Sequence, residues 1–111
     1  MKTKLKELRL EYRLLQKQFS HLGWLSHGYV QDRGSGAGGP CYQWSRKESK
    51  KTVSVALSKE QYTALKEASE NWRQAQLILK RMEQISRWII FYTLPDTKRR
   101  KALSDRVLGL N

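Results

Sequence analysis

The chain has 111 residues, enough for one modest domain, and its 22 lysines and arginines outweigh 10 acidic residues to give a net charge of +12. This charge attracts polyanions, either nucleic acid or an anionic lipid surface, while a hydrophobic content of 39% and four tryptophans argue against a wholly disordered chain. A single cysteine excludes an internal disulfide, and the longest apolar run, residues 88–92, is far shorter than the roughly 20 residues of a membrane span. We therefore expect a cytoplasmic protein with no membrane partner.

Residues 3–19 are predicted to form the first helix. One face of it repeats apolar residues at spacings of three and four: Leu5, Leu8, Tyr12, Leu15 and Phe19. Basic residues occupy the remaining surface: Lys2, Lys4, Lys6, Arg9, Arg13 and Lys17. Two interpretations fit this basic surface, a solvated face opposite the core or a face that contacts phosphates. The apolar spacing also suits a helical pair, within the chain or between chains.

A small antiparallel sheet of three strands is predicted next. Residues 27–33 can form a short first strand, and residues 34–40 form a glycine-rich loop with a permissive backbone. Two further strands are predicted over residues 41–47 and 51–57, because both alternate in side-chain character. Residues 48–49 are the predicted turn between them, so these two strands form a hairpin.

The alternation defines two sets of side chains on this hairpin. One face of its first strand carries Tyr42, Trp44 and Arg46. One face of its second strand carries Val53, Val55 and Leu57. If the three apolar residues form the covered face, the two rings can be open to solvent, and otherwise the rings pack under the long helix as core.

A capping box formed by Ser58 and Gln61 predicts the start of a long helix. No glycine or proline follows until Pro95, and apolar residues track one face from Tyr62 to Tyr92. A helix of about 35 residues is about 52 Å long at 1.5 Å per residue, which exceeds the width of a compact domain of this size. Part of this helix must therefore contact the first helix, a second protomer or a ligand.

The end of the chain is predicted to form a short basic helix. Asp96 is the candidate N-terminal cap of this helix, and Gly109 is the residue at which it is expected to end. It carries four consecutive cations: Lys98, Arg99, Arg100 and Lys101. These form either a solvated tail or an arm that follows a phosphate backbone. The predicted organisation is a single α+β domain over residues 1–93 and a basic C-terminal helix or tail over residues 94–111.

Residues suited to catalysis or metal binding are sparse. His21 and His27 are the only histidines and Cys41 is the only thiol, so a zinc site made from them lacks a fourth soft ligand. The ten carboxylates include no isolated apolar pair of the kind that acid–base catalysis uses. The glycine-rich loop lacks a P-loop lysine, and it is either a flexible connection or a loop whose amides approach a phosphate. We therefore expect no enzyme and no cofactor.

The runs WLSHGYV at residues 24–30, GPCYQWS at 39–45 and KKTVSVALSKE at 50–60 occur in a fixed order, followed by Asn-Trp-Arg at 71–73. Together they resemble a family of short bacterial proteins that are often found near transposases. The resemblance covers residues 5–90 and implies a helix, three strands and a long helix, with a mobile-element context. Family members carry a cysteine cluster between the first two strands. This chain has glycines there, so no metal role is carried over.

The sequence thus predicts an α+β fold and a non-enzymatic nucleic-acid-binding accessory protein for DNA or RNA. Cations would hold phosphates, and rings would stack on bases or pack in a groove. The predicted contact residues are Arg33, Tyr42, Trp44, Arg46, Lys47, Lys50, Lys51, Lys98, Arg99, Arg100 and Lys101. The alternative is a protein–protein interaction module, a homodimer or a subunit of a larger partner, built on the long helix. A buried seam between chains at Trp72, Trp88 and Tyr92 would favour this alternative.

Overall fold

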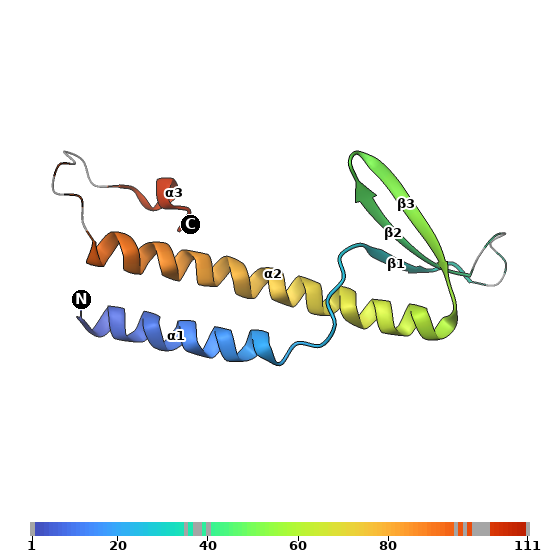
Figure 1. The fold of residues 1–111 in the computed structure, drawn as a ribbon, viewed down its shortest axis with the longest axis horizontal. Helices are drawn as coiled ribbons and strands as arrows, with labels where there is room; N and C mark the ends of the chain where they lie inside the picture. The colour runs from blue at the N-terminus through green and yellow to red at the C-terminus, as the bar shows by residue number, and fades with distance from the viewer. Residues whose placement is uncertain are drawn as a thin grey trace. The chain divides into compact units, whose positions relative to one another are not determined.

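The structure is a computed structural model that describes residues 2–34, 36, 39, 41–94, 96, 98 and 103–110. Figure 1 shows its elements, α1 (Lys2–Ser20), β1 (Tyr29–Asp32), β2 (Tyr42–Glu48), β3 (Lys51–Leu57), α2 (Lys59–Thr93) and α3 (Asp105–Leu108). The three strands form one antiparallel sheet in the order β1-β2-β3. The predicted α+β fold, with an N-terminal helix, a three-stranded sheet, a long helix and a short last helix, is confirmed.

The chain divides into two compact units. The sheet unit is Leu22–Ala75 and contains the three strands with the first part of α2. The helical unit joins Met1–His21 to Gln76–Asn111 and contains α1, the rest of α2 and α3. The boundary falls inside α2, so the predicted domain over residues 1–93 stays a prediction.

The turn between β2 and β3 is one residue later than the sequence predicts. Glu48 belongs to β2 and pairs with Lys51, which leaves Ser49 and Lys50 as the two turn residues. Both have positive φ angles, 49° and 69°. A two-residue hairpin turn of this kind matches the twist of the strands, but glycine or asparagine normally fills it.

The strand register decides between the two arrangements that the sequence left open for the rings on β2. Residues directly opposite each other in an antiparallel pair share a face. Tyr42 is opposite Leu57, and Trp44 is opposite Val55. This shared face meets α2, where the ring of Tyr42 lies 4.7 Å from the ring of Tyr62. The rings and the apolar residues are therefore on the covered face together.

Small residues on α2 let the chain before β1 lie close to this helix. The Ser26 amide donates to the Ala68 carbonyl at 3.2 Å, and the Ser69 hydroxyl donates to the Gly28 carbonyl at 3.1 Å. Gly28 has a φ of 119°, and a Cβ there would lie 2.3 Å from Nε1 of Trp44. Only glycine fits this position, because a side chain would meet both backbone strain and a collision.

The predicted capping box at the start of α2 is present. The Gln61 amide donates to the Ser58 hydroxyl at 3.1 Å, and the Ser58 amide donates to the Gln61 side-chain oxygen at 2.9 Å. Two backbone donors that the first turn of the helix cannot satisfy thus find partners. The sequence therefore located this helix start correctly.

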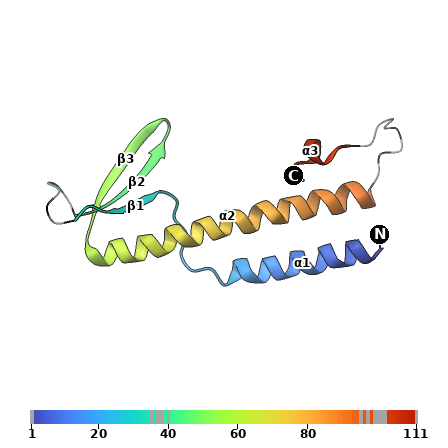
Figure 2. The same cartoon turned by 180° about the vertical axis from the view of Figure 1, so that it is seen from behind.

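In the helical unit, α1 lies beside the second part of α2 and runs antiparallel to it (Figures 1 and 2). The buried apolar residues of this unit include Leu8, Ile78 and Ile85. Arg81 donates to both carboxylate oxygens of Glu11, from Nε at 2.5 Å and from its terminal nitrogen at 2.9 Å. The hydrogen bonds from Arg81 hold the pKa of the Glu11 carboxyl below its usual range, although partial burial acts against this.

The last helix that the described residues contain is Asp105–Leu108. Its cap is the hydroxyl of Ser104 rather than Asp96, so the predicted cap was wrong. Gly109 ends it in the left-handed conformation, as predicted. Lys98 lies in a turn before this helix, and its amide donates to the Asp96 carboxylate at 2.9 Å. The predicted contact residues Arg99, Arg100 and Lys101 lie outside the described residues.

Candidate nucleic-acid interface

The face of the sheet that points away from α2, here called the outer sheet face, is polar. Its members follow from the alternation along each strand and the register between strands. They are Tyr29, Gln31, Gln43, Ser45, Lys47, Thr52, Ser54 and Ala56. None of these side chains is a carboxylate, so the outer sheet face presents hydrogen-bonding groups and positive charge without a negative charge among them.

Tyr29 is the aromatic residue of the outer sheet face. It is 61% exposed, and it begins the edge strand β1, where it lies opposite Ser45. The next outer-face residue along β2 is Lys47, a diagonal neighbour of Tyr29 at roughly 7–8 Å between strands. An accessible flat ring and an ammonium group are therefore adjacent on one surface.

The turn end of the hairpin adds further cations. Lys47, Lys50 and Lys51 are all exposed, and Figure 1 shows this end of the β2–β3 hairpin projecting away from α2. The structure thus brings three of the predicted contact residues together at one end of the sheet. Lys47 belongs to the outer sheet face and Lys50 to the turn, whereas Lys51 lies opposite Glu48 on the covered face, so the three cations surround the tip of the hairpin.

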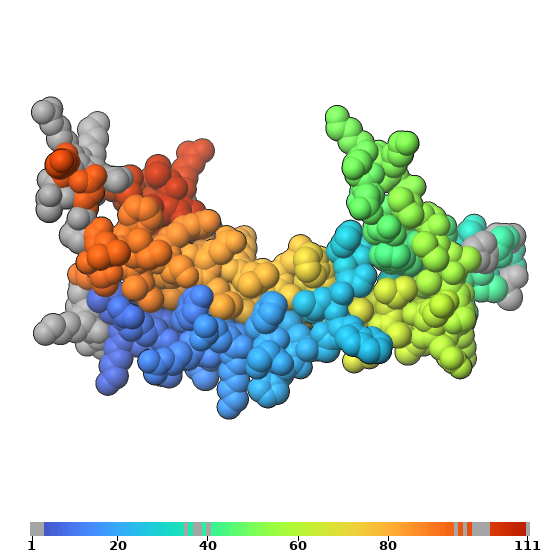
Figure 3. All heavy atoms as spheres, viewed as in Figure 1, coloured from blue at the N-terminus to red at the C-terminus, as the bar shows by residue number. Residues whose placement is uncertain are grey.

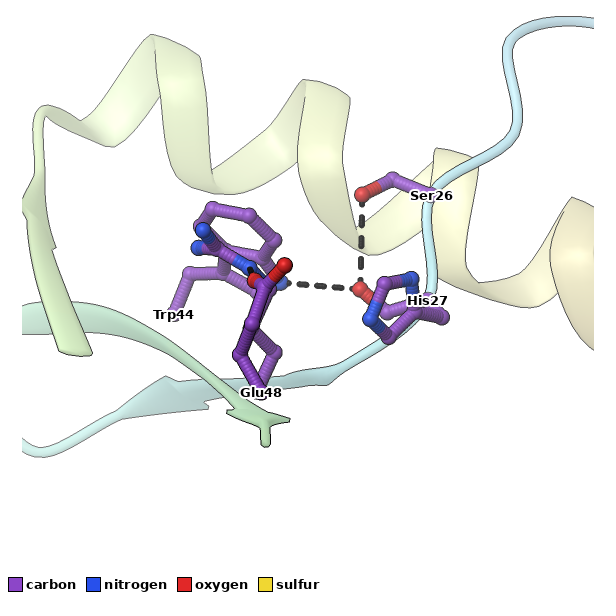
Figure 4. Close-up of polar contacts among 5 residues, drawn as sticks. Ser26, His27, Trp44 and Glu48 are labelled. Carbon is purple, nitrogen blue, oxygen red and sulfur yellow. Dashed lines mark hydrogen bonds and ion pairs between the residues drawn. The ribbon is translucent and has the colours of Figure 1, made fainter. Parts of the chain in front are cut away.

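Trp44 and Arg46 are held by contacts on the covered face. Nε1 of Trp44 donates to the His27 carbonyl at 3.0 Å, and the Ser26 hydroxyl donates to the same oxygen at 3.3 Å (Figure 4). The Arg46 guanidinium lies 4.6 Å from the Trp44 ring centre and donates to Glu48 at 2.9 Å. These contacts give both residues a structural role, and their predicted role in nucleic-acid binding stays a prediction.

Tyr42 and Arg33 lie at the other end of the sheet from the turn. Tyr42 is half-buried against Tyr62, so one side of its ring is already in contact. Arg33 is exposed and continues the strand pairing, since its amide donates to the Cys41 carbonyl at 2.6 Å. Tyr42 and Glu48 are six positions apart along β2, a distance of about 20 Å. The sheet does not bring Arg33 and Lys50 into one site.

Two exposed aromatic residues were missed by the sequence reasoning. The sequence placed Tyr29 on the first strand but did not assign it to either face of the sheet. Only the pairing of Tyr29 with Ser45 shows that it lies on the outer sheet face. Trp24 is 82% exposed on the segment between α1 and β1, and its carbonyl accepts from the Asn71 side chain at 3.1 Å. It borders a pocket of about 280 Å³ that also includes Gly23 and Glu67. The sequence signal that could have identified both aromatic residues is the run of glycine and aromatic residues in which they lie.

The histidines and the cysteine are not gathered into a reactive site in the described part of the chain. His27 packs its ring 6.1 Å from that of Trp72, while His21 Nδ1 donates to the Lys17 carbonyl at 2.6 Å. Cys41 is exposed and free. Over the described residues, no three histidine, cysteine or acidic side chains are close enough to hold a metal ion.

Within the same residues, no helix is both long enough and apolar enough to pass through a membrane. Comparisons with models of protein families, with curated proteins and with solved structures found no match. The resemblance to transposase-associated bacterial proteins therefore remains a prediction from the sequence.

Proposed function

We propose that this chain is a non-enzymatic nucleic-acid-binding accessory protein that holds single-stranded DNA or RNA on its outer sheet face. The observation that carries the proposal is the adjacency of exposed Tyr29 and Lys47 on a surface whose side chains include no carboxylate. A mobile-element context is a prediction from the resemblance alone.

Tyr29 supplies the stacking group of this proposal. Every base has a flat face, so stacking on an exposed ring binds single strands with little sequence preference and contributes about 1–3 kcal/mol per base. Strand positions suit this role because a sheet holds its side chains at fixed spacings. Among the described residues, the ring of Tyr29, unlike the ring of Tyr42, is not packed against another ring.

Three lysines supply the phosphate contacts. Lys47, Lys50 and Lys51 are exposed, and none of them forms an ion pair with a described residue. Glu48 lies directly opposite Lys51, but its carboxylate is paired with Arg46 at 2.9 Å and forms no ion pair with these three lysines. Contacts of this kind are independent of base sequence and weaken as salt concentration rises.

Fluorescence anisotropy with labelled single-stranded DNA and RNA, over a series of salt concentrations, tests the proposal. We expect Tyr29→Ala to lower the affinity about 5- to 150-fold, the equivalent of one lost stacking contact. Tyr29→Phe keeps the ring and should bind like the parent chain. Replacing Lys47, Lys50 and Lys51 with glutamine should reduce the slope of log affinity against log salt by about 2.

Tyr92→Ala is the matched control, because it removes an exposed tyrosine from α2 instead of from the sheet. It should leave the affinity for single strands unchanged. The proposal is wrong if the parent chain fails to bind any single strand at low salt, or if Tyr29→Ala and Tyr92→Ala bind equally well.

Exposed apolar residues at the C-terminal end of α2 favour a second function, protein–protein interaction. Four large apolar residues there are exposed: Ile90, Phe91, Tyr92 and Leu94. Trp72 and Trp88, by contrast, are half-buried within the chain, against His27 and beneath the Lys4 ammonium. The exposed residues therefore support a protein partner that binds to and covers the end of α2.

A further inference from the structure

The outward surface of α1 carries a row of four exposed cations, here called the α1 basic stripe: Lys6, Arg9, Arg13 and Lys17. At about 100° per residue, they fall within an arc about 80° wide, centred about 140° from the buried Leu8. In Figure 3 the atoms of α1 (blue) form an open edge on the side away from α2. The stripe is therefore accessible along its length.

The charges of the stripe are not compensated by the described residues. None of the four cations forms an ion pair there. The two carboxylates of α1, Glu7 and Glu11, lie at least about 80° around the helix from the stripe, and Glu11 is held by Arg81. Like charges four residues apart destabilise a helix by about 0.2–0.5 kcal/mol per pair. Binding of an anion would relieve this repulsion.

α1 presents the stripe as a fixed, straight array. Leu8 is 2% exposed, the Glu11–Arg81 pair has two hydrogen bonds, and the Lys4 ammonium lies 5.0 Å from the Trp88 ring centre. From Lys6 to Lys17 the helix rises about 16 Å. Duplex DNA presents one phosphate per roughly 1.7 Å of its axis, so roughly ten phosphates lie within this length.

We propose that the α1 basic stripe binds the phosphate backbone of double-stranded DNA without reading its sequence. A straight array of cations matches a stiff duplex, whose persistence length is about 50 nm, better than it matches a flexible single strand. The stripe belongs to the helical unit, whereas the outer sheet face belongs to the sheet unit. Duplex binding by the stripe therefore does not depend on the proposed function of the sheet.

An anionic lipid surface is the competing occupant. Leu5 and Leu10 line a hollow of about 390 Å³ together with Lys6, Arg9 and Arg13. A helix that lies in a membrane interface needs a broad apolar face free to enter the lipid. The main apolar face of α1 is turned inward around Leu8, whereas Leu10 and Leu14, 58% and 54% exposed, lie beside the stripe and are too few to form such a face. The duplex is favoured because the four cations of the stripe outnumber these two apolar side chains.

Fluorescence anisotropy with a labelled duplex of mixed sequence, titrated with the full chain over a salt series, tests this inference. The test variant replaces Lys6, Arg9, Arg13 and Lys17 with glutamine. We expect its salt slope to fall by about 3–4, because each lost phosphate contact changes the slope by about 0.9. Its thermal midpoint should stay equal or rise, since the like-charge pairs are gone. If the four cations only stabilised the fold, replacing them would lower the thermal midpoint instead.

The control removes the same number of charges from α2 by changing exposed cations seven residues apart to glutamine: Lys59, Lys66, Arg73 and Lys80. It should change the slope by less than about 1. A milder variant, Arg13→Gln with Lys17→Gln, should lower the slope by about 2 and serves if the fourfold variant does not fold. The double variant Arg9→Lys and Arg13→Lys should bind like the parent chain.

The inference would be overturned if the stripe and control variants lost equal amounts of duplex affinity, because net charge alone would then explain binding. Tighter binding to duplex RNA than to duplex DNA would overturn the choice of DNA. Stripe-dependent binding to phosphatidylserine vesicles without duplex binding would assign the surface to lipid. Tyr29→Ala should keep full duplex affinity, so failure of the sheet proposal and failure of this one give different results.

Discussion

Lys50 lies at a backbone position where a residue with a side chain lowers the stability of the fold. It occupies a turn position with a φ of 69°, where an L-residue with a side chain is strained by about 1–2 kcal/mol. The same position holds its ammonium at the projecting end of the hairpin, beside exposed Lys51. Strain at such a position is often associated with function.

Lys50→Gly should therefore stabilise the chain and weaken its binding to single strands. We expect a gain of about 0.5–1 kcal/mol, because glycine adopts a positive φ without strain but loses more backbone entropy on folding. The urea midpoint at constant slope measures the stability, and anisotropy measures the binding. Lys50→Gln separates the two effects, since it removes the charge but keeps the strain, and should weaken binding without stabilising. A loss of stability in Lys50→Gly would contradict this account of the turn.

At the scale of elements, one ion pair fixes α1 against α2. The Arg81 guanidinium and the Glu11 carboxylate make two parallel hydrogen bonds, a geometry that favours arginine over lysine. Both side chains remain about 40% exposed, so water screens the interaction. The pair therefore sets the alignment of the two helices more than it sets the total stability.

The stability that this pair contributes should depend on pH in a defined direction. Because the folded pKa of Glu11 is lowered, the contribution is complete above the usual glutamate value of about 4.3 and is lost as the pH falls through the lower, folded value. Glu11→Gln should cost up to about 1 kcal/mol at pH 7, after allowance for screening. Urea unfolding at pH 7 and below pH 4 should show the difference between parent and variant shrinking on acidification.

Glu83→Gln is the control for this measurement. It breaks the exposed pair with Arg87, whose single contact spans 3.3 Å between neighbours on one turn of α2. Such pairs contribute about 0.3–0.5 kcal/mol. A larger loss from Glu83→Gln than from Glu11→Gln would show that the contact between α1 and α2 is not the stronger one.

For the whole molecule, charge and exposed apolar surface act in opposite directions. The net charge of +12 makes copies of the chain repel each other, while the apolar residues at the end of α2 offer a surface for association. Repulsion between like-charged chains is screened within about 8 Å at physiological salt. A polyanion such as the proposed nucleic-acid partner would neutralise the charge directly.

We predict that the chain alone is a monomer in sedimentation equilibrium at micromolar concentration and physiological salt. The apolar residues at the end of α2 are few, and stable dimers bury roughly 800 Å² on each partner. A dimer that Phe91→Ser dissociates would contradict this and favour the second function in its self-associating form. Phe91 is suitable because it is exposed and its replacement leaves the buried core residues untouched.

Local sequence signals determined the elements of this protein, because each depends on neighbouring residues. The spacing of Leu5, Leu8 and Tyr12 predicted α1, the Ser58–Gln61 capping box predicted the start of α2, and alternation predicted β2 and β3. The positive charge that points to a polyanion is likewise a property of composition. The predicted cap of the last helix was wrong, because serine and aspartate both cap helices and only the structure shows that Ser104 does so here.

Only the tertiary structure decided which side chains of the sheet are open. Shifting a strand by one residue would exchange its two faces, and alternation within one strand carries no information about its partner. The register put Tyr42 and Trp44 on the face toward α2 and left Tyr29 and Lys47 outside. The candidate site therefore moved from the rings that the sequence emphasised to a tyrosine on the neighbouring strand, because pairing between strands is set by long-range packing.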